Sequence, residues 1–283
     1  MGRWLTFLKE RIPYYSYSFL VSGIALSGIF VAKKHFSLEH FAISFGGLFL
    51  FFSILCVIND IKDIARDRIA HPQRPLARGL LTLQEAREGL KGFFALMLAY
   101  AIIVRFVVHA EAFRSYLVMI GYLWLMSHQF FLGLWIIERP LLYAVSNQLM
   151  IFPIAAFTLS IAEPSLAISM TTLWYGMFLF GAFLAYEVGR NWDPRAHPVL
   201  NTYRQVYGTI PSAGFIALAM VLAAIGAYSL KIHHLTWTIQ ALTAIIPFMI
   251  GFKAPRAYFS VKFAVSLTLV YHTWVIAIDN IFR

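Results

Sequence analysis

Long apolar stretches constrain the fold of this chain more than any other feature of its sequence. A transmembrane helix needs about 20 predominantly apolar residues. Nine stretches approach that length, at residues 13–32, 39–58, 90–108, 114–136, 140–161, 165–186, 207–230, 235–252 and 258–279. Charged residues make up only 13% of the chain, against about 25% in soluble globular proteins. The sequence therefore predicts an all-α membrane protein, a bundle of about nine transmembrane helices forming a single domain over residues 1–283.

The basic residues fall unequally on the two sides of this predicted bundle. With alternating loops, 17 of the 23 Lys and Arg residues lie on the side of the N-terminus. Cytoplasmic loops carry an excess of Lys and Arg, so this side is predicted to be cytoplasmic, in the inner membrane of a bacterium. The net charge of +10 then reflects membrane topology, and we expect neither a nucleic-acid partner nor an obligate protein partner. Both long loops, 59–89 and 187–206, lie on this side, where we expect them to cover a central cavity that opens to the cytosol.

The first polar segment of interest comes directly after the second apolar stretch. It contains Asn59, Asp60, Asp63 and Asp67. If the helix continues at about 100° per residue, these side chains lie within about 100° of one another on one face. Three neighbouring carboxylates repel one another unless a cation lies between them, and Mg²⁺ typically takes a few carboxylates together with phosphate oxygens of a substrate. The segment therefore predicts a catalytic magnesium–diphosphate site at the end of a membrane helix.

A second polar segment ends the sixth apolar stretch. Glu187 and Asn191 are four residues apart and share a helix face, with Arg190 on its flank. Asp193 follows, directly before Pro194, which is expected to stop the helix. Two acidic helix ends on one side of a bundle can hold metal ions against opposite sides of one diphosphate, whose departing charge the ions neutralise. We therefore predict Glu187 as a catalytic residue, and Glu187, Asn191 and Asp193 as metal ligands.

Basic side chains of the same loops are predicted to bind the diphosphate. Residues 74–79 combine a rigid proline with two guanidiniums, which suits bidentate phosphate recognition. The last loop on this side adds two further cations. The predicted diphosphate-binding residues are Arg66, Arg74, Arg78, Arg190, Lys253 and Arg256.

The first segment and the residues that follow it resemble the UbiA superfamily of intramembrane prenyltransferases. The resemblance rests on Asn59-Asp60-x-x-Asp63-x-x-x-Asp67 and on the Arg-Pro-Leu-x-x-Gly pattern at 74–79. It implies the transfer of an isoprenyl group from a prenyl diphosphate to a lipophilic or aromatic acceptor, with Mg²⁺ as cofactor. The three aspartates would be metal ligands, and Asn59 would support the diphosphate.

Two segments depart from the pattern of that family. The family commonly has D-x-x-x-D in the second segment, where this chain has Glu187-x-x-x-Asn191; either one metal is lost or Asp193 takes its place. Many benzoate-prenylating members carry a Lys-Arg pair in the fifth span, where residues 142–148 contain neither. A benzoate acceptor is therefore not expected, and Tyr143 and Asn147 of that stretch are predicted to contact the substrate instead.

The chemistry expected of such a site is ionisation of an allylic diphosphate. The resulting carbocation needs a dry cavity, and the ring faces of Tyr143, Tyr186 and Tyr203 are expected to stabilise it. Asp67 or Glu187 would take the proton that the acceptor loses. A membrane terpene cyclase of the same superfamily would use the same diphosphate site without a separate acceptor. A secondary transporter is the alternative of another class, although transport sites usually lie near the midplane on broken helices.

Overall fold

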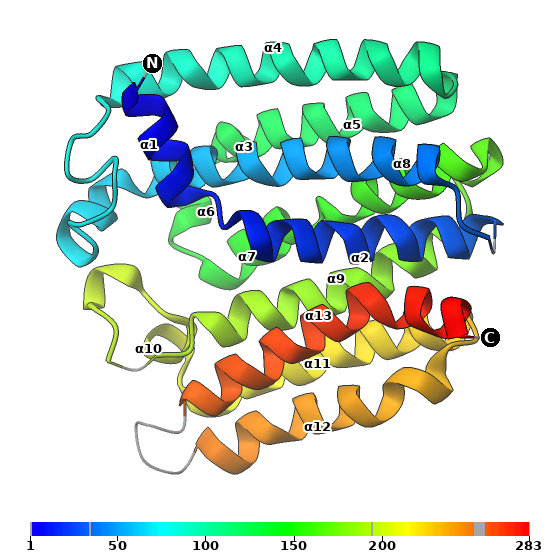
Figure 1. Ribbon diagram of the computed structural model, residues 1–283. Helices are drawn as coiled ribbons and strands as arrows, with labels where there is room; N and C mark the ends of the chain where they lie inside the picture. Colours follow the sequence, from blue (N-terminus) through cyan, green and yellow to red (C-terminus); the bar gives the residue numbers. More distant parts are fainter. Residues whose placement is uncertain (1, 34, 194, 252–257, 283) are drawn as a thin grey trace.

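The structure is a computed structural model, which describes residues 2–33, 35–193, 195–251 and 258–282. All secondary structure in these ranges is helical, which confirms the predicted all-α fold. The long helices run side by side along one axis (Figure 1). The α-helices, long and short together, are α1 (Gly2–Arg11), α2 (Tyr14–Lys33), α3 (Leu38–Ala70), α4 (Leu83–Val107), α5 (Ala110–Ser127), α6 (Leu134–Ile137), α7 (Pro140–Gln148), α8 (Ile151–Ala162), α9 (Met170–Arg190), α10 (Tyr203–Tyr207), α11 (Thr209–Ser229), α12 (His233–Gly251) and α13 (Tyr258–Phe282), and the 3-10 helices are η1 (Gln129–Phe131), η2 (Pro164–Leu166) and η3 (Pro198–Leu200).

Within the residues described, six helical segments are long and apolar enough to cross a membrane. They are Tyr14–Ala32, Leu38–Ala70, Leu83–Val107, Pro140–Ala162, Thr209–Ser229 and Tyr258–Phe282. The predicted spans 114–136, 165–186 and 235–252 are occupied mainly by α5, α9 and α12, which are helical but are not among these six. The number of nine transmembrane helices stays a prediction.

The expectation of one continuous helix over 114–136 is wrong. Helix α5 ends at Ser127, and Gln129, Phe130 and Phe131 have φ angles of 52°, 55° and 60°. A left-handed backbone cannot continue a right-handed helix. The stretch 140–161 differs: α7 and α8 meet at Leu149 and Met150, both of which keep right-handed helical angles, and the segment counts as one of the six. Apolar composition gives the length of such a stretch but does not reveal a change of backbone direction within it.

Helix α3 runs without a break from Leu38 to Ala70, so the helix does continue through the first polar segment. The hydroxyl of Ser37 accepts a hydrogen bond from the backbone N–H of His40 and caps the helix start. The helix ends one residue before His71, whose successor Pro72 disfavours further helix. The predicted long loop 59–89 is therefore only residues 71–82, because α4 begins at Leu83 behind a Thr82–Glu85 capping box.

Helix α1 was not predicted, because its cations were attributed to membrane topology alone. It packs onto the start of α4, with the ring of Trp4 5.5 Å from that of Phe7 and 5.8 Å from that of Phe93. Ion pairs add to this contact, with Arg3 on Glu85 at 2.5 Å and Glu10 on Arg78 at 2.7 Å. Phe7, Val57, Leu76, Leu81 and Ala86 form one buried apolar cluster. Helix α1 thereby fixes the 71–82 loop against α3.

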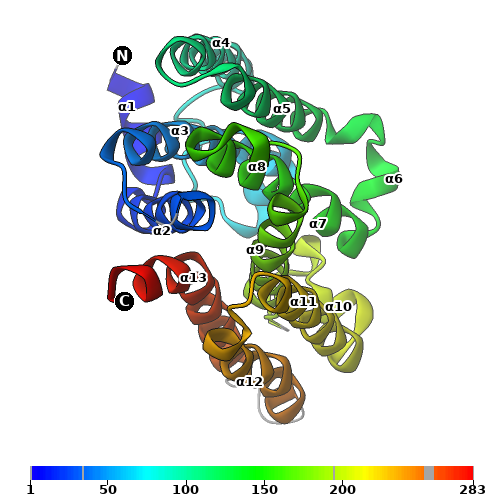
Figure 2. The same cartoon turned by 90° about the vertical axis from the view of Figure 1, so that its right-hand side faces the viewer.

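Helix α9 is central to the other half of the bundle. In the end-on view it lies between α8 and the group of α11 and α13, all of which it contacts (Figure 2). Its packing against α11 needs glycine: a Cβ at Gly181 would lie 2.3 Å from the carbonyl oxygen of Ala219, and one at Gly226 would lie 2.6 Å from the backbone nitrogen of Phe178. Small residues of this kind let two membrane helices approach closely.

The two polar segments meet at one end of the bundle. The C-terminal ends of α3 and α9, helix α10 and the N-terminus all lie at the left of Figure 1, and the C-terminal end of α13 lies at the right. We call the left end the motif end. The 3-10 helix η3, in the segment that follows α9, contacts α3. The fold therefore brings residues 59–67 and 187–200 into one neighbourhood, although more than a hundred residues separate them in sequence.

Candidate functional site

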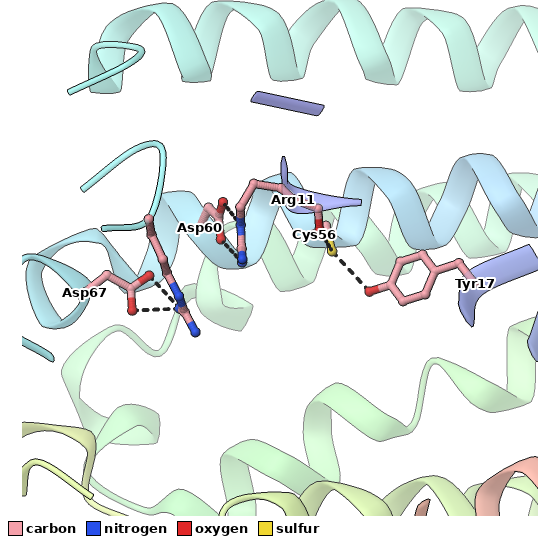
Figure 3. Close-up of polar contacts among 6 residues, drawn as sticks. Arg11, Tyr17, Cys56, Asp60 and Asp67 are labelled. Carbon is pink, nitrogen blue, oxygen red and sulfur yellow. Dashed lines mark hydrogen bonds and ion pairs between the residues drawn. The ribbon is translucent and has the colours of Figure 1, made fainter. Parts of the chain in front are cut away.

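Two aspartates of α3 are held by arginines from other segments. Arg11, the last residue of α1, donates from Nε to Oδ2 of Asp60 at 2.5 Å and from Nη2 to Oδ1 (Figure 3). Arg74 of the 71–82 loop donates from Nη1 to both carboxylate oxygens of Asp67 at 2.7 Å. The side chains of Asp60 and Asp67 are only 2% and 5% exposed. A buried carboxylate is costly unless it is paired, so these arginines make the burial of the motif possible.

Arg11 is the main site residue that sequence reasoning missed. Burial lowers the pKa of the Arg11 guanidinium, but the hydrogen bond to Asp60 and the surrounding groups, Asp67 among them, together raise it by more, so the group is firmly cationic. Arg11 stands 49 residues before its partner, and only the tertiary fold brings the two together. The one signal in the sequence was its position directly before the first apolar stretch, on the same predicted side as the motif.

The remaining aspartate, Asp63, is different. Its carboxylate makes no hydrogen bond or ion pair with any other residue that the structure describes, and the side chain is only partly exposed. Its strongest electrostatic interaction with a cation is with the adjacent Lys62. Asn59 and Arg66, also predicted as site residues, are partly buried on α3. Asp63 is therefore the aspartate whose oxygens are available without displacing an arginine.

Lys62 itself was not predicted. Its ammonium is buried and has no hydrogen-bond acceptor. It lies over the ring of Tyr143, 5.2 Å from the ring centroid, so it points from α3 toward α7. Asn147, one turn further along α7, also has a buried side-chain oxygen, Oδ1, without a donor. The predicted substrate contacts Tyr143 and Asn147 thus lie on the helix that Lys62 faces.

The second polar segment is organised locally. Arg190 donates from Nε to Oε2 of Glu187 at 2.7 Å, and Asn191 donates from Nδ2 to Oε1 of Glu187 at 2.9 Å. Asp193 lies beyond the helix, where its Oδ1 accepts the backbone N–H of Arg195 at 2.9 Å. The carboxylate of Asp193 is therefore engaged in its own turn rather than directed at Glu187. Helix α9 ends at Arg190, before Pro194, which lies outside the described residues.

Tyrosines connect the two segments. The Arg190 guanidinium lies 5.8 Å from the centroid of the Tyr186 ring. Tyr203 of α10 is buried, and it interacts electrostatically with Glu187, Arg190 and Tyr143. Burial raises the pKa of Tyr203 well above its usual value, so its hydroxyl stays protonated at neutral pH. Lys62, Tyr143, Tyr203 and Glu187 therefore form a series in which each side chain interacts with the next.

Aromatic rings also lie on the apolar side of the motif. The hydroxyl of Tyr17 is 3.0 Å from the sulfur of Cys56, one turn before Asp60 (Figure 3). The ring of Tyr17 is 6.0 Å from that of Phe52, which stacks at 6.2 Å on Phe183 of α9. Phe52 and Phe183 are both buried. This aromatic group joins the two motif helices just inside the apolar part of the bundle.

Some predicted residues are not brought to the aspartates. Arg78 is tied to Glu10 and to the carbonyl oxygen of Gln73. Lys253 and Arg256 lie outside the described residues.

Two hollows of about 380 and 290 Å³ run along α12 and α13, and neither is lined by a residue of the two polar segments. The predicted central cavity stays a prediction.

The oxygen donors of the two segments bear on a possible magnesium site. Among the residues that the structure describes, no group of three or more His, Cys, Asp or Glu side chains converges as a ready metal site. This follows from the arginines, which turn Asp60 and Asp67 toward Arg11 and Arg74. The oxygen-only donors and the free carboxylate of Asp63 nevertheless fit a hard cation such as Mg²⁺.

Comparison with known structures supports a common fold. Digeranylgeranylglyceryl phosphate synthase matches with a TM-score of 0.62 at 19% identity, over 99% of this chain and 100% of that one. A UbiA homologue from Aeropyrum pernix K1, in its apo form, matches with a TM-score of 0.60 at 16% identity, over 94% and 97%. A UbiA homologue from Archaeoglobus fulgidus, bound to GPP and Mg²⁺, matches with a TM-score of 0.59 at 16% identity, over 99% and 100%. No curated protein matches in sequence.

A sequence model described as the UbiA prenyltransferase family matches residues 20–197, a range that includes both polar segments. It covers more than half of the chain, and the apolar helices and the fold agree with it. The resemblance drawn from the first segment is therefore confirmed, and the chain is a membrane protein that belongs to the UbiA prenyltransferase family.

Proposed function

We propose that this chain is an intramembrane prenyltransferase that moves an isoprenyl group from a prenyl diphosphate to a lipophilic or aromatic acceptor. The observation that carries the proposal is the first segment, where buried Asp60 and Asp67 are each paired with an arginine and Asp63 is left free. Two solved structures of a UbiA homologue from Archaeoglobus fulgidus hold GPP or DMAPP together with Mg²⁺, which supports a prenyl diphosphate as donor.

Asp60, Asp63 and Asp67 would hold magnesium, with Glu187, Asn191 and Asp193 as the proposed second group of ligands. Magnesium, when bound with the diphosphate, supplies positive charge that makes it a better leaving group. Arg11 and Arg74 already present guanidiniums at the carboxylates, and guanidiniums bind phosphate oxygens bidentately. We assign these two arginines, with Arg66, Arg190 and Asn59, to the diphosphate; Arg78, Lys253 and Arg256 complete the proposed cationic set.

The reacting carbon would lie on the apolar side of the aspartates. Breaking the C–O bond leaves positive charge on the allylic carbon, and aromatic ring faces stabilise such charge. Tyr17, Phe52 and Phe183 pack together on the apolar side of the aspartates, and apolar surroundings of this kind would keep out the water that quenches the cation. The acceptor then forms the new bond and loses a proton, which Asp67 or Glu187 would accept.

The membrane arrangement belongs to the same proposal. We propose nine transmembrane helices in a single domain over residues 1–283, with the motif end and its cavity facing the cytoplasm of a bacterial inner membrane. The excess of Lys and Arg on the loops at that end supports this orientation.

The test uses the full chain in lipid with Mg²⁺ and a panel of prenyl diphosphates, and it follows pyrophosphate release with and without acceptors. We expect release that EDTA abolishes and that Asp63→Asn lowers strongly, because that change removes the free carboxylate while keeping its shape. Glu88→Gln, which alters only an exposed ion pair with Lys91, is the matched control and should retain full activity. A product without a separate acceptor would identify a cyclase. Failure of the wild type to bind or consume any diphosphate would reject the proposal and favour a transporter.

A further inference from the structure

A pair of stacked phenylalanines joins the two helices that carry the polar segments. The rings of Phe52 in α3 and Phe183 in α9 lie 6.2 Å apart, with an angle of 13° between their planes. The two residues are only 3% and 5% exposed. Helix α3 packs mainly against α2, α4 and α8, whereas α9 packs mainly against α8, α11 and α13. Neither helix is a principal neighbour of the other, so this contact depends on two large side chains that meet between them.

The pair lies between the polar segments and the apolar core. Phe52 is eight residues before Asp60, which is about 12 Å along the axis of α3. Phe183 is four residues before the glutamate of the second segment, about 6 Å along α9. One turn further from the motif end, Leu48 of α3 and Leu179 of α9 are completely buried. The stacked rings are therefore the layer at which the interior between α3 and α9 becomes closed apolar core.

A third ring closes the side of this layer toward α2. The ring of Tyr17 lies 6.0 Å from that of Phe52, and its hydroxyl is 3.0 Å from the sulfur of Cys56. Cys56 is one turn nearer the motif end than Phe52, on the same row of side chains along α3. Cys56 is partly exposed and Phe52 is buried. Between these two residues the row thus changes from an accessible surface to a packed one.

We propose that Phe52 and Phe183 form the floor of the site for the prenyl tail and limit the donor to tails no longer than geranyl. The inference rests on the proposed prenyl transfer, in which the reacting carbon lies on the apolar side of the aspartates and the tail extends toward the core. An extended chain advances about 1.2 Å per bond, so the main chain of a geranyl group spans about 8 Å and that of a farnesyl group about 13 Å. The depth of about 6–12 Å between the carboxylates and the rings accommodates the first and not the second.

The selectivity follows from packing rather than from charge. A farnesyl tail would have to displace one of the stacked rings. Protein interiors are close-packed, and extra volume forces side chains off their preferred rotamers. Neither ring can move away from the motif end without disturbing Leu48 or Leu179, which are fully buried behind them. The longer donor is therefore discriminated against by the layer itself.

The experiment offers the full chain in lipid, with Mg²⁺, the dimethylallyl, geranyl, farnesyl and geranylgeranyl diphosphates, each at the same concentration per lipid. It measures pyrophosphate release and, with the matching unreactive S-thiolodiphosphates, affinity. The affinities separate the fit of the tail from any part that the rings play in the chemistry. We expect the wild type to favour geranyl over farnesyl at least about tenfold in both quantities, since an apolar pocket discriminates by size on this scale.

Variants move the floor in both directions. Phe52→Ala and Phe183→Ala each open the layer and should bring the ratio of farnesyl to geranyl close to one. Cys56→Phe places a ring one turn nearer the motif end, about 6 Å from Asp60 along the axis. This variant should restrict use to the dimethylallyl donor, whose main chain spans about 4 Å.

Phe178→Ala is the matched control. Phe178 belongs to the same helix as Phe183 and is fully buried, but its ring stacks on His272 of α13 at 4.7 Å. Its loss should lower the thermal stability and leave the order of donors unchanged. Where an alanine variant does not fold, Phe52→Leu or Phe183→Leu opens the layer less and should raise the relative use of farnesyl by a smaller factor.

Two results would overturn the assignment. One is a wild type that binds and uses farnesyl or geranylgeranyl diphosphate as well as geranyl diphosphate, which would mean that the tail leaves the bundle sideways into lipid. The other is a set of folded Phe52 and Phe183 variants with the same order of donors as Phe178→Ala. A wild type that binds none of the four diphosphates is a separate outcome, and it rejects the prenyltransferase proposal itself.

Discussion

The two polar segments at the motif end differ in how their carboxylates are neutralised. In the first, Asp60 and Asp67 are buried and depend on Arg11 and Arg74, which come from α1 and from a loop. In the second, Glu187 is partnered by Arg190 and Asn191, three and four residues away on the same helix. The first arrangement exists only in the folded bundle, whereas an isolated helix end could form the second.

This difference predicts which of the two segments is more sensitive to substitution. A buried charge that loses its partner is expensive, while exposed pairs between near neighbours on a helix contribute little. The Arg190 side chain is 44% exposed and that of Arg11 is 22% exposed. We therefore expect substitutions in the first segment to cost more than corresponding ones in the second.

The largest effect is expected for Asp60→Asn. The change removes a buried carboxylate from the diphosphate site and leaves Arg11 without its counter-charge. Pyrophosphate release should fall by about 10²–10³-fold, the usual cost of losing one electrostatic contact at a reacting centre. Single-turnover release in lipid measures the fall, with thermal unfolding as a check that the bundle persists. A variant that is folded and fully active would show that Asp60 only neutralises Arg11.

Arg11→Met should have the next largest effect. Groups that position metal-binding carboxylates typically contribute about 10–100-fold to affinity or activity, and Arg11 holds both oxygens of Asp60. The loss should appear in the half-saturating concentrations of Mg²⁺ and prenyl diphosphate. Arg3→Met is the matched control, since Arg3 lies on the same helix and forms an exposed pair with Glu85. Equal losses in the two variants would mean that α1 matters only as a packed helix.

Glu187→Gln should reduce pyrophosphate release by roughly tenfold, equivalent to about 1.4 kcal/mol of barrier. The amide keeps the shape of the side chain and can still accept from Asn191, so the local network survives in part. Side-by-side rates with Asp60→Asn measure the contrast between the segments. Losses of equal size would contradict it and would assign the two segments equal shares in the reaction.

Asn191→Asp should give the smallest change, and in the opposite direction. It replaces the amide that donates to Glu187 with a second carboxylate at i+4, which a metal ion can bridge. We expect the half-saturating Mg²⁺ concentration to fall by about two- to fivefold, the range of an exposed charge pair. In EDTA the same variant should be slightly less stable, because like charges at i and i+4 repel. No response to Mg²⁺ would indicate that this helix end does not contact a metal.

The sequence revealed those parts of the site that depend on local structure. Asp60, Asp63 and Asp67 share one face because a helix has a fixed period, and Arg74 is close to Asp67 because only a short loop separates them. Arg11 and Lys62 were missed for the same physical reason: a lysine or arginine next to a membrane span is normally a topological signal. Their roles depend on which helix lies opposite, and periodicity does not contain that information.

The break after Ser127 was missed for a related reason. Residues 114–136 have the composition of one span, and nothing in apolar content marks the left-handed backbone at Gln129–Phe131. By contrast, the helical continuation assumed for the first polar segment is present, and α3 has no glycine or proline between Asn59 and Ala70.

The unbroken length of α3 links the reaction to the lipid around it. Asp60 is 22 residues after Leu38, which places it about 33 Å along the helix axis. The hydrocarbon core of a bilayer is about 30 Å thick. No hinge lies between Leu38 and Asp60 in α3. In a bilayer with longer acyl chains, Asp60 therefore cannot keep its depth through the bending of a loop: either α3 tilts, or the carboxylates move toward the hydrocarbon. The acyl-chain length of the host membrane therefore affects the polarity of the surroundings in which the diphosphate must ionise.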